Sequence, residues 1–235
     1  MIIFTHIPKT AGSSFYWSLI EPNTPDAVVY RYRGLRRLLL DRGYSADVVR
    51  GHAPYGVHVF APRTPAKYIT ILREPVDRSV SYYYFVKDSG REHPDRADAE
   101  SLTLTSFFSL RKYQNWQTRY LAGIPFHRLY GSGTGPALDR AMLRAALTHL
   151  VNRYVCFGIQ ENFESSLALA AHSMQWPERK EMPRLNSTHD RPDVATLTSA
   201  ELQSLRESNA LDCELYEQAR ALFELRCGQI GVRTG

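Results

Sequence analysis

The sequence has few cysteines, few lysines and no long apolar run, and each shortage excludes a class of protein. Its three cysteines, Cys156, Cys213 and Cys227, cannot all pair and form no metal-like cluster with histidine, so we expect reduced thiols. No window approaches the roughly 20 apolar residues of a membrane-spanning helix. The first residues also lack the basic and apolar regions of a secretion signal. The sequence therefore predicts neither a membrane span nor secretion.

Length and composition are those of an ordinary globular protein. The 235 residues are 43% hydrophobic and 23% charged, and they contain no internal repeat, low-complexity tract or Gly/Ser linker. We therefore expect a single domain over residues 1–235. The net charge is +5, and of 29 basic residues only five are lysine. The excess of arginine has two explanations, a GC-rich genome or a need for planar guanidinium groups that bind sulfate, phosphate and carboxylate.

Apolar runs alternate with helical patterns along the chain. Strands are predicted over 2–6, 27–30, 47–52, 67–72 and 154–159, and helices over 15–20, 34–43, 104–122, 137–150, 161–174 and from 198 onward. The helix 15–20 is expected to open after the serine pair, and the helix 34–43 to close at Gly43. This alternation predicts an α/β fold with a mainly parallel central sheet flanked by helices. Ligands of such folds bind beyond the carboxyl ends of the strands.

Proline, helix-capping residues and polar stretches indicate where several helices and loops begin or end. Pro75 suits the first turn of a helix after strand 67–72. Thr198 and Glu201 have capping-box spacing, and the helix that they open is expected to kink near Asn209. The polar stretch 88–100 is predicted as a mobile surface loop, and 177–193, with three prolines, as another loop.

The first motif that carries chemistry is T-H-I-P-K-T-A-G-S-S-F, residues 5–15, between a predicted strand and a predicted helix. Small residues let backbone N–H groups point at an anion, and Lys9 with three hydroxyl groups adds charge and donors. The motif differs from a Walker A loop because Lys9 precedes Gly12. Its length argues against an ordinary Gly/Ser turn. We interpret it as a phosphate-type anion site.

The second motif is I-T-I-L-R-E-P-V-D-R-S-V-S-Y-Y-Y-F, residues 69–85. Arg73 ends a strand and Ser81 lies in the second turn of the next helix, so together they are able to hold a second anion. An arginine in a strand-to-helix turn is only moderately specific by itself. The aromatic run 82–85 is more typical of core packing than of a binding surface.

The two motifs in this order resemble the PAPS-dependent sulfotransferases, within them the branch of heparan sulfate 2-O-sulfotransferase and its bacterial relatives. Weaker similarities continue over nearly the whole chain, at 51–56, 115–123, 157–167, 184–192 and 211–219. The resemblance implies a P-loop-like sulfotransferase fold and the cofactor 3′-phosphoadenosine 5′-phosphosulfate (PAPS), released as PAP. It implies no metal.

The resemblance also implies roles for individual residues. Lys9 matches the lysine that contacts the 5′-phosphosulfate and stabilises the leaving phosphate, and the rest of the cradle matches Thr10, Ala11, Gly12, Ser13 and Ser14. Arg73 and Ser81 match the pair that binds the 3′-phosphate. His52 matches the proposed catalytic base. The segment 184–192 resembles one that folds over the adenosine and 3′-phosphate, with Asn186 and Arg191 as candidates.

His52 is weighed separately because a lone histidine is more often structural than catalytic. It ends the apolar run 47–50, so it is expected at the carboxyl end of a strand beside the anion site. An imidazole titrates near neutrality and accepts a proton from a hydroxyl group. His6 is a competing candidate that we expect to be packed. The other histidines show no metal spacing.

We therefore predict sulfuryl transfer from PAPS to an acceptor hydroxyl by in-line displacement, with His52 as general base and Lys9 stabilising charge. The acceptor is expected to be a carbohydrate, a glycoconjugate or a small molecule, with an anionic acceptor among the options, and no nucleic-acid partner is expected. Arg119 and the basic segment 31–50 are candidates for an acceptor-facing wall, although a solvated helix face explains the segment better. A cytoplasmic, bacterial enzyme is expected. The alternatives are a P-loop-type kinase and a non-catalytic nucleotide- or glycan-binding module.

Overall fold

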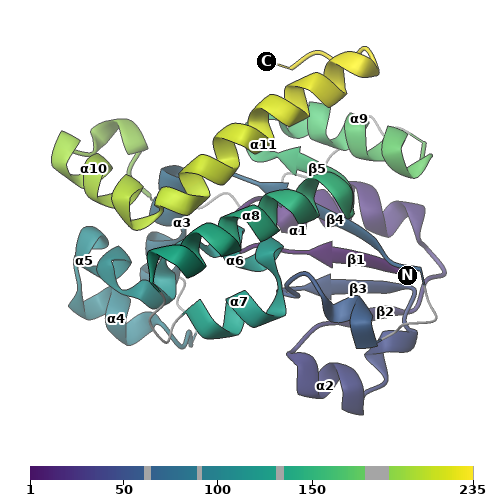
Figure 1. The fold of residues 1–235 in the computed structure, drawn as a ribbon, viewed down its shortest axis with the longest axis horizontal. Coiled ribbons are helices and arrows are strands. Elements are labelled where there is room, and N and C mark those ends of the chain that lie inside the picture. The colour runs from purple at the N-terminus through teal and green to yellow at the C-terminus, as the bar shows by residue number, and fades with distance from the viewer. Residues whose placement is uncertain (61–64, 89–91, 131–134, 178–190, 235) are drawn as a thin grey trace.

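Five parallel strands form one sheet in the order β2-β3-β1-β4-β5. Figure 1 shows the computed structural model, which describes every residue except 61–64, 89–91, 131–134, 178–190 and 235. The strands are β1 (Ile2–Thr5), β2 (Val29–Arg31), β3 (Val48–Gly51), β4 (Lys67–Leu72) and β5 (Tyr154–Ile159). All five lie at or next to predicted strands, and the predicted parallel sheet flanked by helices is confirmed.

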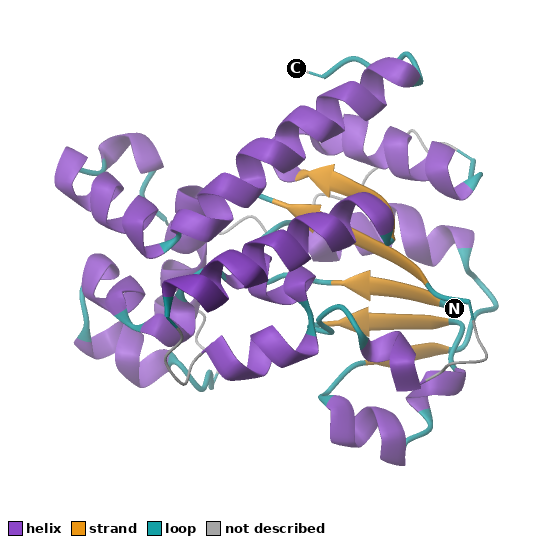
Figure 2. Ribbon diagram, in the orientation of Figure 1, coloured by secondary structure: helices purple, strands orange, loops and turns teal. Residues whose placement is uncertain are grey.

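Helices occupy most of the remaining described chain. They are α1 (Gly12–Phe15), α2 (Leu35–Leu40), α3 (Pro75–Asp88), α4 (Arg96–Ser101), α5 (Leu104–Ser109), α6 (Trp116–Ala122), α7 (Ile124–Leu129), α8 (Pro136–Asn152), α9 (Phe163–Met174), α10 (Ser199–Ser208) and α11 (Ala210–Gln229). Helix α1 continues directly into a π-helical turn, Tyr16–Ile20. Figure 2 shows that helices lie on both sides of the sheet.

Each face of the sheet buries its own apolar cluster. Residues of successive strand positions point to opposite faces, so Ile3 and Phe4 of β1 enter different clusters. The Ile3 side packs against α6, α8 and α11, which cross in front of the sheet in Figure 1. The Phe4 side packs against α1, the π-helical turn and α9. Both faces are thereby removed from water, as the continuous apolar strands require.

A third apolar cluster lies beyond the carboxyl ends of the strands. Helices α3, α4, α5 and α10 contribute buried residues such as Val80, Phe107 and Leu205. The strand arrowheads in Figure 2 point toward this group of helices. The loops that leave β1, β3 and β4 therefore end between the sheet and a second packed layer.

Three predicted boundaries are wrong. The first helix begins at Gly12, before the serine pair, because Ala11 in a left-handed conformation (φ 60°) turns the chain one step earlier. Helix α2 ends at Leu40, and Arg42 (φ 53°), not Gly43, adopts the left-handed conformation. The polar stretch 88–100 contains helix α4, which buries Ala99 among the aromatic residues of the third cluster.

The predicted end of the chain is confirmed. Thr198 and Glu201 form a reciprocal capping box at the start of α10. The helix breaks at Asn209, whose buried amide donates to the Leu205 carbonyl oxygen at 3.0 Å, and α11 follows at once. The segment 177–193 that we predicted as a loop lies mostly outside the described residues.

Candidate functional site

The loop after β1 has a constrained backbone. Lys9 and Ala11 are both left-handed, with φ of 66° and 60°. Gly12 cannot be replaced by a larger residue, since a Cβ there would lie 2.2 Å from the His6 ring. The first backbone hydrogen bond of α1 runs from Phe15 N–H to the Ala11 oxygen at 3.0 Å. The N–H groups of residues 12–14 precede that bond, and helix starts of this kind favour anions.

The three hydroxyl groups of this loop do not share one role. The Thr10 side chain is fully buried, and its hydroxyl donates to the Ile7 carbonyl oxygen at 2.9 Å. This hydrogen bond closes the loop, so the Thr10 hydroxyl hydrogen is not available to a ligand. Ser13 is partly exposed and Ser14 lies at the edge of burial, both in the first turn of α1. The predicted anion site thus consists of backbone and serine groups, and Thr10 stabilises the loop from within.

Lys9 lies in a strongly cationic environment. Its Nζ lies 4.4 Å from the centre of the Phe85 ring, on α3. Burial and the neighbouring charges of Arg73 and Arg191 lower the pKa of Lys9 to about 8. Three cations therefore gather from the ends of β1 and β4 and from residue 191. Such a concentration of like charge favours an anionic ligand.

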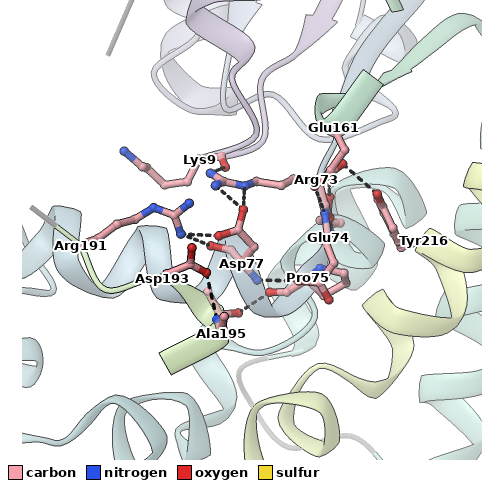
Figure 3. Close-up of polar contacts among 12 residues, drawn as sticks. Lys9, Arg73, Glu74, Pro75, Asp77, Glu161, Arg191, Asp193, Ala195 and Tyr216 are labelled. Carbon is pink, nitrogen blue, oxygen red and sulfur yellow. Dashed lines mark hydrogen bonds and ion pairs between the residues drawn. The ribbon is translucent and has the colours of Figure 1, made fainter. Parts of the chain in front are cut away.

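Arg73 and Arg191 converge on the carboxylate of Asp77 (Figure 3). The Nε of Arg73 lies 2.8 Å from Asp77 Oδ2, and its NH1 group donates to the Lys9 carbonyl oxygen at 3.0 Å. Arg191 forms an ion pair with the other Asp77 oxygen. Burial raises the pKa of Asp77, but the two guanidinium groups outweigh it, so the net pKa is lowered and the carboxyl stays ionised.

The backbone of Arg73 is fixed from the opposite side. The buried side chain of Gln117 accepts the Arg73 N–H at 3.0 Å and donates to the Arg73 carbonyl oxygen at 2.8 Å. Helix α6, which carries Gln117, is fixed in turn by Asp212 of α11. That carboxylate accepts hydrogen bonds from the backbone N–H groups of Gln117 and Thr118 at 3.1 and 2.7 Å. Position and direction of Arg73 thus depend on elements far apart in sequence.

Ser81 is almost fully buried, with 2% of its surface exposed. It lies on α3, four residues after Asp77, and residues four apart share one face of a helix. Ser81 therefore faces the same side of α3 as the carboxylate that holds both arginines. Tyr82 and Tyr83 beside it are buried in the third cluster, as the sequence predicted for this aromatic run.

His52 lies immediately after β3, which pairs with β1 on the side opposite to β4. Its Nδ1 lies 2.7 Å from the His6 carbonyl oxygen, and the two imidazole rings are 5.1 Å apart. A carbonyl oxygen only accepts, so Nδ1 carries the hydrogen and the lone pair of neutral His52 is on Nε2. Desolvation of the ring lowers the pKa of His52, and the hydrogen bond to the His6 carbonyl oxygen partly opposes this shift. Neutral His52 thus has the tautomer that a general base needs.

His6 itself is unsuited to that role. Burial, followed by the charges of His52 and Arg50, lowers the pKa of His6 to about 3. Its ring packs directly over Gly12, and it stacks with Phe4 at 5.8 Å. The prediction that His6 is packed is confirmed in this sense. Its backbone oxygen nevertheless orients the neighbouring imidazole, so one residue joins the loop to His52.

Arg119 does not form part of an acceptor-facing wall. Only 8% of its surface is exposed, and it donates to the carbonyl oxygens of Lys112 and His127 at 2.8 and 3.3 Å. The sequence prediction for this residue is wrong because α6 turns it into the interior. Arg78 is buried completely, near Asp212, and was not predicted as part of any site.

The predicted residues collect along the carboxyl ends of three adjacent strands. Lys9 follows β1, Arg73 follows β4 and His52 follows β3, with β1 in the middle. The chain leaves β1 toward β2 and leaves β4 toward β5, so the strand order reverses between them. Crevices at such reversals are the usual ligand sites of open α/β sheets.

Two residues of this arrangement were missed. Asp77 has an i, i+4 relation to Arg73, which is a recognisable ion-pair spacing, but nothing in the sequence links it to Arg191. Gln117 lies in the weakly similar stretch 115–123, but no role was predicted for it. Arg191, a predicted candidate, does lie here, whereas its companion Asn186 lies outside the described residues.

No group of three or more His, Cys, Asp or Glu side chains among the described residues is arranged to hold a metal ion. Among the same residues, none of the helices combines the length and apolarity required to cross a bilayer.

The chain is similar to proteins of known function. The family model described as galactose-3-O-sulfotransferase matches residues 50–234. The matched range includes His52, Arg73 and Ser81 and begins after the loop that contains Lys9. A mouse sulfotransferase, SULT7A1, solved in complex with PAP, aligns with a TM-score of 0.46 and 14% identity, covering 88% of this chain and 64% of that one.

The curated relatives are glycan sulfotransferases. Heparan sulfate 2-O-sulfotransferase 1 of Gallus gallus is 23% identical over 189 residues, covering 72% of this chain and 53% of the relative. The Drosophila melanogaster heparin sulfate O-sulfotransferase is 24% identical over 260 aligned residues, covering 95% of this chain and 72% of the relative. The chain thus spans about half the length of the first of these relatives.

Proposed function

The chain belongs to the galactose-3-O-sulfotransferase family, and from that premise we propose that it transfers a sulfuryl group from PAPS to a carbohydrate hydroxyl. The observation that carries the proposal is the convergence of Lys9, Arg73 and Arg191 at the carboxyl ends of β1 and β4. Bound there, PAPS would supply an activated sulfuryl group on a phosphate leaving group. A donor with phosphate groups at both ends of its ribose needs cations in two neighbouring places.

The residues present fit such a donor. Arg73 and Arg191 both bind the carboxylate of Asp77, so the two guanidinium groups converge on one place where oxyanion oxygens lie. Toward the described residues Arg73 uses three of its five N–H groups, on Asp77 and Lys9, and the other two would bind a phosphate. The loop 9–14 and the start of α1 would hold the 5′ side. Arg73, Ser81 and Arg191 would hold the 3′-phosphate.

His52 would act as the general base. Its Nδ1 hydrogen is held by the His6 oxygen, so a proton from the acceptor hydroxyl would move to Nε2. The lowered pKa keeps the imidazole neutral before the reaction. Lys9, as the ammonium, would stabilise charge that develops on the leaving phosphate. These roles place the base after β3 and the cation that stabilises the leaving group in the loop after the neighbouring strand β1.

The acceptor is inferred from the relatives, whose names specify glycans. A hydroxyl group on a carbohydrate or glycoconjugate is the acceptor that we propose. A cytoplasmic location and a bacterial source stay predictions of the sequence.

The test is calorimetric titration of the full chain with PAP, ADP and ATP, each with and without Mg²⁺. Metal-independent binding of PAP in preference to ADP supports the proposal. Preference for ATP with Mg²⁺ favours a kinase, and binding of none of the three favours a non-catalytic module. Arg144→Ala, an exposed arginine of α8, is the matched control for Arg73→Ala.

A further inference from the structure

A second cationic group lies next to His52, on the β2–β3 side of the sheet. Arg31, the last residue of β2, pairs in register with Arg50 of β3, and Arg50 pairs with Phe4 of β1. Paired residues of parallel strands point to the same face. The two arginine side chains therefore leave neighbouring strands on the same face of the sheet, and Arg50 lies two residues before His52.

Aromatic rings flank this arginine pair. The guanidinium of Arg50 lies 4.4 Å from the Tyr16 ring centre and 5.1 Å from the Trp17 ring centre. Tyr16 is buried, whereas Trp17 exposes 42% of its surface. Both belong to the π-helical turn that follows α1, a kind of distortion found often at functional sites. An exposed indole beside a stacked guanidinium offers an apolar face together with a charge.

The charge of this pair is not neutralised within the described part of the chain. No carboxylate among those residues forms an ion pair with Arg31 or Arg50. Both charges nevertheless act on the loop after β1, because each contributes to lowering the pKa of His6. The group therefore combines positive charge, exposure of Trp17 and proximity to His52. It lies on the far side of β1 from the Arg73 and Arg191 cluster.

We propose that Arg31 and Arg50, with Trp17, form the acceptor subsite that binds an anionic substituent, a carboxylate or a sulfate, of the sugar chain being modified. The inference rests on the proposed function, since His52 must act on a hydroxyl of the bound sugar. An anion held by the two arginines places a hydroxyl of the same or the adjacent ring toward Nε2 of His52. The indole of Trp17 covers an apolar sugar face. The subsite selects acidic over neutral acceptors.

The experiment measures binding of three oligosaccharide probes to the full chain, with and without PAP. The probes are an unsulfated uronate-containing hexasaccharide, its carboxyl-reduced neutral counterpart, and a sulfated oligosaccharide without uronate. We compare Arg31→Ala, Arg50→Ala and Arg50→Lys with Arg36→Ala. Arg36 is an exposed arginine of α2 in the same basic segment, so its removal gives the same change in net charge.

Arg31→Ala and Arg50→Ala are each expected to weaken binding of an acidic probe about tenfold, as loss of a charge-assisted bond does. Arg50→Lys keeps the charge but not the planar stacking, so an intermediate loss is expected. Arg36→Ala and the carboxyl-reduced probe are expected to show less than a twofold effect. Comparing the uronate and sulfate probes identifies which anion the subsite prefers.

Two results overturn the inference: acidic probes bind no better than the neutral one, or Arg36→Ala weakens them as much as Arg50→Ala. Failure of the proposed function looks different. If PAP does not bind but acidic probes bind through Arg31 and Arg50, the donor assignment falls and the subsite stands. If PAP binds normally to every variant while acidic probes are not selected, the subsite falls and the donor assignment stands.

Discussion

The carbonyl oxygen of His6 lies 2.7 Å from Nδ1 of His52 and fixes its tautomer. Both residues follow strands that pair in parallel, with Thr5 of β1 opposite Gly51 of β3. The peptide of one candidate residue thereby orients the side chain of another. A carbonyl oxygen that accepts Nδ1–H does for this imidazole what a carboxylate does in many catalytic sites.

Replacement of His52 by alanine is expected to abolish sulfuryl transfer with PAP affinity unchanged within about twofold. The imidazole follows β3, whereas Arg73, which would bind the 3′-phosphate, follows β4 on the opposite side of β1. Single-turnover assays and calorimetry separate the two effects. His172→Ala, an exposed histidine on α9, is the control. Turnover near the native rate in His52→Ala would assign the base to another residue.

The pH dependence of transfer follows from the tautomer and the lowered pKa of His52. The base works when it is neutral, and its pKa lies below the ordinary histidine value of about 6.5. The acid limb of the kcat/KM profile is therefore expected to be half-maximal below pH 6.5. A profile that is half-maximal at or above pH 6.5 would contradict this assignment.

PAP affinity is expected to fall as pH rises through about 8, where ligand-free Lys9 loses its charge. The pKa of Lys9 is lowered by burial first and by Arg73 next. Arg73→Ala should accordingly move the alkaline limb to higher pH while weakening binding at pH 7 by about ten- to a hundredfold. Calorimetry from pH 6.5 to 9.5 measures both, and Lys9→Met, which cannot titrate, is expected to give no limb.

Asp77→Asn is expected to destabilise the fold by about 1–2 kcal/mol at pH 7, since it releases two guanidinium groups from a partly buried carboxylate. The native pKa of Asp77 is lowered, so its contribution is complete above the unfolded value near 3.8 and is lost as pH falls through the native value. Thermal unfolding at pH 7 and pH 3 measures the difference. A gap between wild type and variant that persists unchanged below pH 3 would contradict this account. The control is Glu100→Gln, which removes the carboxylate of an exposed ion pair with Arg96 on α4.

Asp212→Ala is expected to cost about 3–5 kcal/mol, because it leaves the N–H groups of Gln117 and Thr118 and the charge of Arg78 without their buried partner. Urea unfolding measures the loss. Since Gln117 holds the Arg73 backbone, any folded fraction should also bind PAP more weakly. Glu214→Ala, an exposed carboxylate on the same helix, tests whether a charge change in α11 is enough.

The elements around the site were predictable where a local signal was strong. Strand β4 matches its predicted bounds, because a β-branched and aromatic run is followed directly by Arg73 and by Pro75 at the helix start. The signal failed where the chain depended on packing elsewhere. The polar stretch that contains α4 has no apolar period, yet it becomes helical because Ala99 fits into the third apolar cluster.

The sequence by itself determined the motifs, the strands that end in them and therefore the edge of the sheet at which Lys9, His52 and Arg73 lie. These features are local, since they depend on apolar runs and on residues within a few positions. Only the tertiary structure decided which groups face one another: Asp77 between Arg73 and Arg191, the His6 oxygen on His52, and Arg31 beside Arg50. Those contacts depend on strand order and on residues up to 114 positions apart, and no local pattern encodes such pairing.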